Sequence, residues 1–123
     1  MTRRIWLIGG TSESVVLAEA IALSNIPFTI TVTTEVAKGL YSPSPLLRVR
    51  VGRLNPQQVE DFLEVENIIA IVDASHPHAV EISKFAIATA NKYDIPYLRY
   101  ERENLSPPTP LGKGGEEKIV SPL

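Results

Sequence analysis

Ile5-Trp6-Leu7-Ile8-Gly9-Gly10-Thr11-Ser12-Glu13 is the stretch that decides the fold. An apolar run ends in two glycines and two hydroxyl residues, and a helical pattern with one broad apolar face follows over residues 12–24. This order predicts a buried strand, a tight turn and a helix whose first backbone N–H groups are unpaired. Such a helix start favours negative charge, and glycines let a phosphate approach the backbone closely. A Gly-Gly-Thr turn is not specific by itself, because similar turns follow buried strands in proteins that bind no ligand.

Strands and helices alternate along the next hundred residues. The patterns predict strands at 4–8, 28–33, 47–51, 68–73 and 96–99, helices at 12–24, 55–66 and 78–93, and a mobile loop at 35–45. Asn55 is the expected N-cap of the middle helix, because Pro56 and Gln58 follow it. Strands joined by helices form a parallel sheet through right-handed crossovers. We therefore predict an α/β fold, a Rossmann-like doubly wound sheet of about five strands in a three-layer α/β/α arrangement.

The domain boundary is expected near residue 103. Residues 1–103 are predicted to form a dinucleotide-binding Rossmann-like domain, and residues 104–123 a Pro/Gly-rich linker or tail. Lys118-Ile119-Val120 hints at one more strand. A linker that leads to no further domain suggests a truncated chain, and an ordinary frayed terminus is the alternative.

Composition argues against several classes of function. The chain of 123 residues is 44% hydrophobic, as in ordinary globular domains. A net charge of −2 without a basic block favours neither nucleic acid nor an anionic membrane as partner. The absence of cysteine excludes disulfides and thiolate metal sites, and two histidines cannot form a structural zinc site. We expect a cytoplasmic protein, because no signal-peptide pattern and no membrane-spanning apolar run is found.

Four predicted strands end in residues that suit a ligand site. In open parallel sheets, ligands bind beyond the carboxyl ends of the strands. The segments at these ends are Gly9-Gly10-Thr11-Ser12-Glu13, Thr33-Thr34-Glu35, Gly52-Arg53 and Asp73-Ala74-Ser75-His76-Pro77-His78. Their convergence at one edge of the sheet predicts a dinucleotide site more strongly than any single segment does.

The second strand end bears on the choice of dinucleotide. An NAD site usually has a carboxylate there that binds the ribose hydroxyls. Here Thr33 and Thr34 are followed by Lys38, and Arg53 lies at the neighbouring strand end. Hydroxyl groups and cations suit a 2′-phosphate, so the sequence favours NADPH. Glu35 would repel that phosphate, and we expect its carboxylate to face water.

The fourth strand end is the second candidate site. Ser75 as N-cap and Pro77 in the first turn would open another helix N-terminus toward an anion. His76 is the candidate to donate a proton or bind a substrate carboxylate, and the alternative is a structural histidine bonded to the backbone. Asp73 has the alternative role of binding N–H groups of its own loop, and His78 is expected at the surface. The catalytic residue is otherwise unassigned.

These motifs together resemble the precorrin-6A reductase family. They are Leu7-Ile8-Gly9-Gly10-Thr11-Ser12-Glu13, Val49-Arg50-Val51-Gly52-Arg53-Leu54, Val72-Asp73-Ala74-Ser75-His76-Pro77-His78-Ala79 and Pro96-Tyr97-Leu98-Arg99-Tyr100-Glu101-Arg102. Ser75 stands where the family usually has threonine, and His78 where it usually has an aromatic residue. The resemblance implies an oxidoreductase of cobalamin biosynthesis that uses NADPH to reduce a double bond of a tetrapyrrole, precorrin-6A or its cobalt form.

The resemblance also assigns roles to the strand ends. Gly9 and Gly10 would give the pyrophosphate access to the backbone, and Thr11 and Ser12 would donate hydrogen bonds to it. Thr34, Lys38 and Arg53 would surround the ribose phosphate, and residues 73–77 would line the nicotinamide or substrate side. Family members carry a second α/β domain, with the active site between the two. The chain would then be the cofactor-binding half.

One alternative function stays open, and a second is weakened by a missing motif. A non-catalytic nucleotide- or effector-binding module would keep the phosphate-binding turn and lack the cleft. A sugar-nucleotide epimerase or reductase usually has a Tyr-x-x-x-Lys pair, and Tyr93 has no lysine four residues later. A sheet domain without its second domain exposes apolar surface, which favours a homo-oligomer or a separate second domain as partner.

Overall fold

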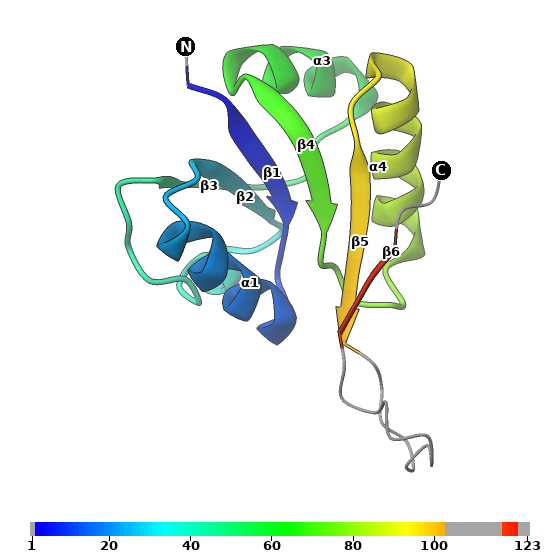
Figure 1. Ribbon diagram of the computed structural model, residues 1–123. Coiled ribbons are helices and arrows are strands. Elements are labelled where there is room, and N and C mark those ends of the chain that lie inside the picture. Colours follow the sequence, from blue (N-terminus) through cyan, green and yellow to red (C-terminus); the bar gives the residue numbers. More distant parts are fainter. Residues whose placement is uncertain (1, 103–116, 121–123) are drawn as a thin grey trace.

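A six-stranded sheet with helices on both faces forms the centre of the computed structural model, which describes residues 2–102 and 117–120 (Figure 1). The strands are β1 Arg4–Ile8, β2 Phe28–Val32, β3 Leu47–Val51, β4 Ile68–Asp73, β5 Tyr97–Arg102 and β6 Glu117–Val120. The helices are α1 Ser12–Leu23, α2 Glu35–Lys38, α3 Pro56–Val65 and α4 Val80–Tyr93. This arrangement confirms the predicted Rossmann-like α/β fold.

The strand order is β3-β2-β1-β4-β5-β6. Strands β1 to β5 are parallel, and β6 pairs antiparallel with β5. The chain runs outward from β1 to β3 and then returns to place β4 on the other side of β1. The connections after β1 and β4 therefore leave the sheet in opposite directions, and this reversal opens a crevice at the carboxyl ends of these two strands.

The two faces of β1 support two separate cores. Trp6 and Ile8 pack with residues of α3 and α4, while Leu7 packs with residues of α1. This division follows from the alternation of side chains along a strand. Trp6 contacts Phe62 of α3 edge-on, with ring centroids 5.0 Å apart. Figure 1 shows α1 on one face of the sheet and α3 and α4 on the other.

Most predicted elements differ from the observed ones only at their ends. The capping prediction for α3 is confirmed: the Asn55 side chain accepts from the Gln58 N–H at 2.9 Å, and the Gln58 side chain accepts from the Asn55 N–H at 3.1 Å. The prediction of a loop throughout 35–45 is wrong at its start, where α2 forms one helical turn. Thr34 begins that turn, because its hydroxyl accepts the N–H of Ala37 at 3.1 Å.

The carboxyl-terminal elements differ more from expectation. Helix α4 begins at Val80 and not at residue 78, and β5 extends to Arg102. Strand β6 includes the three residues that hinted at a strand. The boundary predicted near residue 103 lies outside the described residues. No helix in the described part of the chain is both long and apolar enough to cross a membrane.

Candidate functional site

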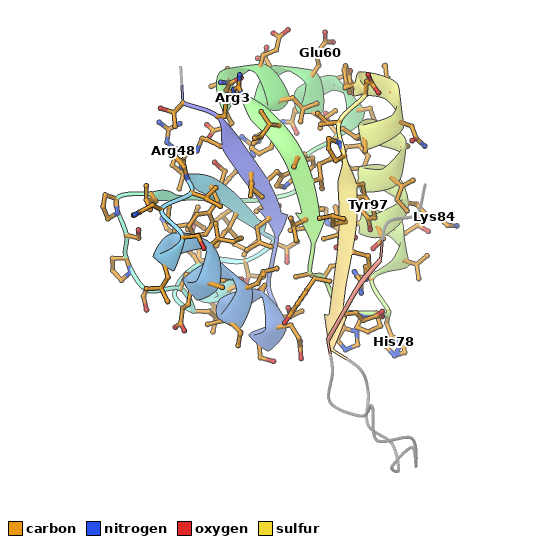
Figure 2. The ribbon with its side chains drawn as sticks, viewed as in Figure 1. Arg3, Arg48, Glu60, His78, Lys84 and Tyr97 are labelled. Atoms are coloured by element: carbon orange, nitrogen blue, oxygen red, sulfur yellow. The ribbon has the colours of Figure 1, made fainter. Side chains whose placement is uncertain are left out.

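A cavity of about 660 Å³ lies where the loops after β1, β2, β3 and β4 meet the start of α4. Seven of the residues predicted to bind the cofactor line it: Gly9, Gly10, Thr11, Thr33, Arg53, Ser75 and His76. His78 also lines it, and Figure 2 shows His78 at the end of the molecule toward which the strand arrows point, far from Arg3 and Glu60. The predicted convergence of the strand ends is therefore present in the structure.

The cavity is lined by both polar and apolar groups. The glycine turn, Thr33 and Arg53 contribute polar groups, while Leu54, Ile82 and Phe85 contribute apolar side chains. Ligand pockets commonly combine an apolar lining with a few polar groups that orient the ligand. This lining suits a molecule that joins flat ring systems to charged groups, which is the chemistry of a dinucleotide.

The two glycines of the turn are required for different reasons. A Cβ atom on Gly9 would lie 2.5 Å from the Tyr41 hydroxyl oxygen and 2.8 Å from a methyl carbon of Ile30. A Cβ atom on Gly10 would meet nothing within 4 Å, but its φ of +101° is a conformation that other residues rarely adopt. Gly9 is thus required by packing inside the fold, and Gly10 by the shape of the turn.

Helix α1 starts in a capping box. Thr11 Oγ1 accepts the Ser14 N–H at 3.1 Å, and Ser14 Oγ accepts the Thr11 N–H at 3.1 Å. The Thr11 hydroxyl donates to the Ala74 carbonyl at 2.7 Å, which joins the ends of β1 and β4 across the crevice. Within the described residues, the backbone N–H groups of Ser12 and Glu13 have no hydrogen-bond partner. These two amides are the donors of the helix start that an anion would find open.

The turn also depends on a residue to which the sequence assigned no role. Tyr41 is buried, and its hydroxyl oxygen accepts the Gly10 N–H at 2.8 Å and lies 2.7 Å from Ser14 Oγ. The available signal was an aromatic residue inside a segment otherwise composed like a loop. An aromatic residue in such a segment indicates a packing contact with another part of the fold.

Asp73 at the end of β4 is buried and accepts hydrogen bonds on both oxygens. Oδ1 accepts from the N–H and hydroxyl of Ser75, and Oδ2 accepts from Ser83 at 2.6 Å and from Tyr97 at 2.5 Å. Oδ1 also lies 3.1 Å from the Arg99 guanidinium. The alternative role, in which Asp73 binds its own loop, is therefore present, and three residues from α4 and β5 extend it.

The pKa values of Asp73 and Tyr97 reflect these contacts. Burial alone would raise the pKa of the Asp73 carboxyl, but the hydrogen bonds from Ser83, Tyr97 and Ser75 outweigh it and hold this pKa below its ordinary value. Burial, followed by the hydrogen bond to the carboxylate, raises the pKa of the Tyr97 hydroxyl. Asp73 is thus a carboxylate and Tyr97 its hydrogen-bond donor at neutral pH.

The predicted cap of α4 by Ser75 is wrong. The Ser75 hydroxyl donates to Asp73 and accepts from Arg99 at 3.0 Å, so it is occupied before the helix begins. Ala79 is the N-cap and makes no side-chain cap bond. Pro77 lies in a turn closed by the Ala79 N–H and the His76 carbonyl at 2.8 Å, and this turn delays the helix to Val80.

The two histidines stack on each other at this turn. Their ring centroids lie 4.9 Å apart, and both side chains are exposed. His76 Nδ1 accepts the His78 N–H at 3.0 Å, so a neutral His76 carries its proton on Nε2. His76 is therefore bonded to the backbone, as in the structural alternative, and its ring still leaves an N–H donor at the cavity.

The remaining predicted residues do not line the cavity: Ser12, Glu13, Thr34, Lys38, Asp73, Ala74 and Pro77. Thr34 caps α2, Lys38 is exposed on α2, and Glu35 is exposed as expected. Their roles toward a cofactor stay predictions. Within the described residues, no group of three or more His, Cys, Asp or Glu side chains could hold a metal ion.

Comparisons with known proteins agree with the fold and the motifs. A family model described as precorrin-6x reductase CbiJ/CobK matches residues 4–116. The cobalt-precorrin-6A reductase of Synechocystis sp. is 46% identical over 109 residues, which are 89% of this chain and 40% of the relative. That of Priestia megaterium is 41% identical over 98 residues, 80% of this chain and 38% of the relative.

A solved structure, described as CobK precorrin-6A reductase, superposes with a TM-score of 0.70 at 25% identity. The match covers 89% of this chain and 42% of that chain. The curated relatives show the same proportion, since the chain spans about 40% of the length of the Synechocystis protein.

Proposed function

This chain belongs to the precorrin-6x reductase CbiJ/CobK family, and on that premise we propose that it binds NADPH and serves the reduction of a double bond of precorrin-6A or its cobalt form. Because it spans about 40% of the Synechocystis relative, this chain would be the part of the enzyme that binds the cofactor. That relative is more than twice as long as this chain.

The observation that supports this function most is the position of the cavity. It lies at the carboxyl ends of the strands, beside the reversal of strand order between β1 and β4. In doubly wound sheets this is the place where dinucleotides bind. The glycine turn lines the cavity and leads into the start of α1, whose two open amides lie next to it in the chain and suit a pyrophosphate, while the apolar lining residues suit a flat ring.

Arg53 supports NADPH over NADH. Its side chain is exposed, lines the cavity and follows β3, while Thr33 lines the cavity after β2. A guanidinium and a hydroxyl are good partners for a phosphate group, and a guanidinium can form two parallel hydrogen bonds to it. No carboxylate of the β2 end lines the cavity, since Glu35 lies outside the lining.

In this proposal the described residues bind and orient the cofactor. When bound, a reduced nicotinamide supplies the hydride, so the protein has to place it and stabilise charge around it. His76 presents an N–H donor at the cavity, where it would hydrogen-bond a polar group of cofactor or substrate. Hydrogen bonds to Asp73 and from Arg99 fix the position of the Ser75 hydroxyl at the cavity.

Calorimetric titration of the chain with NADPH and NADH tests the cofactor assignment. We expect NADPH to bind more tightly, and Arg53→Ala to weaken NADPH by about tenfold or more while NADH changes little. Arg3→Ala is the matched control, because it removes an exposed arginine that does not line the cavity. If neither nucleotide binds the wild-type chain, the cofactor assignment fails. Equal losses for both nucleotides in Arg53→Ala would refute the phosphate role.

A turnover assay distinguishes a reductase from a non-catalytic nucleotide-binding module. Precorrin-6A and its cobalt form are supplied with NADPH, and oxidation of the nucleotide is followed by absorbance. Nucleotide binding without turnover by this chain would fit the half that holds the cofactor, as well as a non-catalytic module. Adding the remaining part of a family member distinguishes them, because only a reductase half regains turnover.

A further inference from the structure

Tyr41 closes over the glycine turn from the connection between α2 and β3. The residues on either side, Leu40 and Ser42, are exposed, whereas Tyr41 is only 8% exposed. Its hydroxyl oxygen lies 2.8 Å from the Gly10 nitrogen and 2.7 Å from Ser14 Oγ. A side chain from a distant segment thus reaches into the turn that forms one wall of the cavity.

Counting hydrogens gives the direction of each bond. Ser14 has one hydroxyl hydrogen, and it goes to the Thr11 carbonyl at 2.6 Å. The Tyr41 hydroxyl is therefore the donor in its contact with Ser14, and its oxygen accepts from Gly10. A directed chain runs from the Gly10 N–H through Tyr41 and Ser14 to the Thr11 carbonyl. It links two successive residues of the turn through Tyr41 and Ser14.

Packing makes this chain specific. Ser14 is fully buried, and a Cβ on Gly9 would lie 2.5 Å from the Tyr41 oxygen and 3.4 Å from Ser14 Oγ, so the three residues are closely packed. Gly10 has a φ of +101° and no side chain whose packing could hold the backbone in this conformation. The hydrogen bond that the Gly10 N–H donates to Tyr41 therefore helps to restrain the turn.

We propose that Tyr41 is a positioning residue for the cofactor, and that it stays bonded to Gly10 when NADPH is bound. Through this bond it holds the Gly9–Thr11 turn in the shape that lines the cavity. The Gly10 amide then belongs to the protein and not to the ligand. Cofactor affinity consequently depends on a hydroxyl that does not touch the cofactor. This inference rests on the proposed function.

The test compares Tyr41→Phe with Tyr93→Phe in the full chain. Tyr93 is a matched control, because its hydroxyl has no hydrogen-bond partner within the described residues. Two quantities are measured: hydrogen exchange of the Gly10 amide by NMR without and with NADPH, and the NADPH dissociation constant by calorimetry. In Tyr41→Phe we expect Gly10 exchange to accelerate and NADPH affinity to fall, each on the order of two- to tenfold. Tyr93→Phe should change neither.

The wild-type chain gives an independent reading that needs no folded variant. NADPH should leave the Gly10 amide as protected as before, or more so. Faster exchange at Gly10 in the complex would overturn the proposal, since the ligand would then displace Tyr41. Unchanged NADPH affinity in Tyr41→Phe would overturn it as well, with the cofactor assignment intact. Failure of the wild-type chain to bind NADPH would instead refute the proposed function, and the cofactor role of Tyr41 with it.

Discussion

Replacement of Asp73 by asparagine should cost the fold a large part of its stability. Asp73 is 0% exposed, accepts from Ser75, Ser83 and Tyr97, and lies 3.1 Å from Arg99. Removing one partner of a buried ion pair typically costs about 3–5 kcal/mol. The cost here should be lower, about 2–4 kcal/mol, because the arginine keeps its bond to the Ser75 carbonyl and the amide oxygen still accepts. Stabilities of single domains are about 5–15 kcal/mol, so such a loss is easily measured.

The assay is urea unfolding followed by tryptophan fluorescence, since Trp6 lies in the core on one face of the sheet. Tyr97→Phe serves as the intermediate variant: it removes one hydrogen bond to a charged group, worth about 1.5–3 kcal/mol, and leaves the ion pair. Tyr93→Phe is the control and should stay within about 0.5 kcal/mol of wild type. A loss below about 0.5 kcal/mol for Asp73→Asn would refute the reasoning. So would a loss smaller than that of Tyr97→Phe, because the ion pair would then contribute nothing.

Three further predictions concern the same fold. The folded-state pKa of Asp73 is lowered, so its contribution to stability is complete above the unfolded-state pKa of about 3.9 and is lost as pH falls through the folded-state value. The difference in unfolding free energy between wild type and Asp73→Asn should therefore be constant near neutrality and shrink below about pH 4. Growth of that difference in acid would contradict this expectation. Gly9→Ala should destabilise the fold by about 1–3 kcal/mol, because the new methyl would lie 2.5 Å from a hydroxyl oxygen. Gly39→Ala is the control and should be nearly neutral, because its methyl would have its nearest contact at 3.5 Å. Thermal unfolding of both variants measures the difference. Asn55→Ala should cost about 1 kcal/mol by removing the N-cap of α3, measured by urea unfolding, and an unchanged midpoint would show that the cap is redundant.

Local features of this protein were readable from neighbouring residues. The capping box of α3 involves residues three positions apart, and the turn after β1 needs only two glycines between an apolar run and a helix. Strand β3 alternates half-buried and exposed residues, as expected near a sheet edge, and the alternation of strands and helices implied a parallel sheet. Such signals act within a few residues of the chain and therefore survive in the sequence alone.

The partners of the site residues required the tertiary structure. Tyr41 meets Gly10 across 31 residues, Thr11 meets Ala74 across 63, and Asp73 meets Tyr97 across 24. These contacts exist only because β1 lies between β2 and β4 and because β5 lies beside β4, an order that an alternating pattern does not specify.

The same reason explains which interpretations changed. Ser75 had the local signature of a helix cap, but Asp73 two residues before it and Arg99 from the neighbouring strand occupy its hydroxyl. Lys38 and Arg53 were equivalent cations in the sequence, and only the path of the chain puts Arg53 at the cavity and leaves Lys38 outside its lining. The sequence by itself determined the elements and the edge of the sheet that carries the polar groups. The tertiary structure decided which of those groups meet, because their hydrogen bonds join residues whose distance along the chain says nothing about their distance in space.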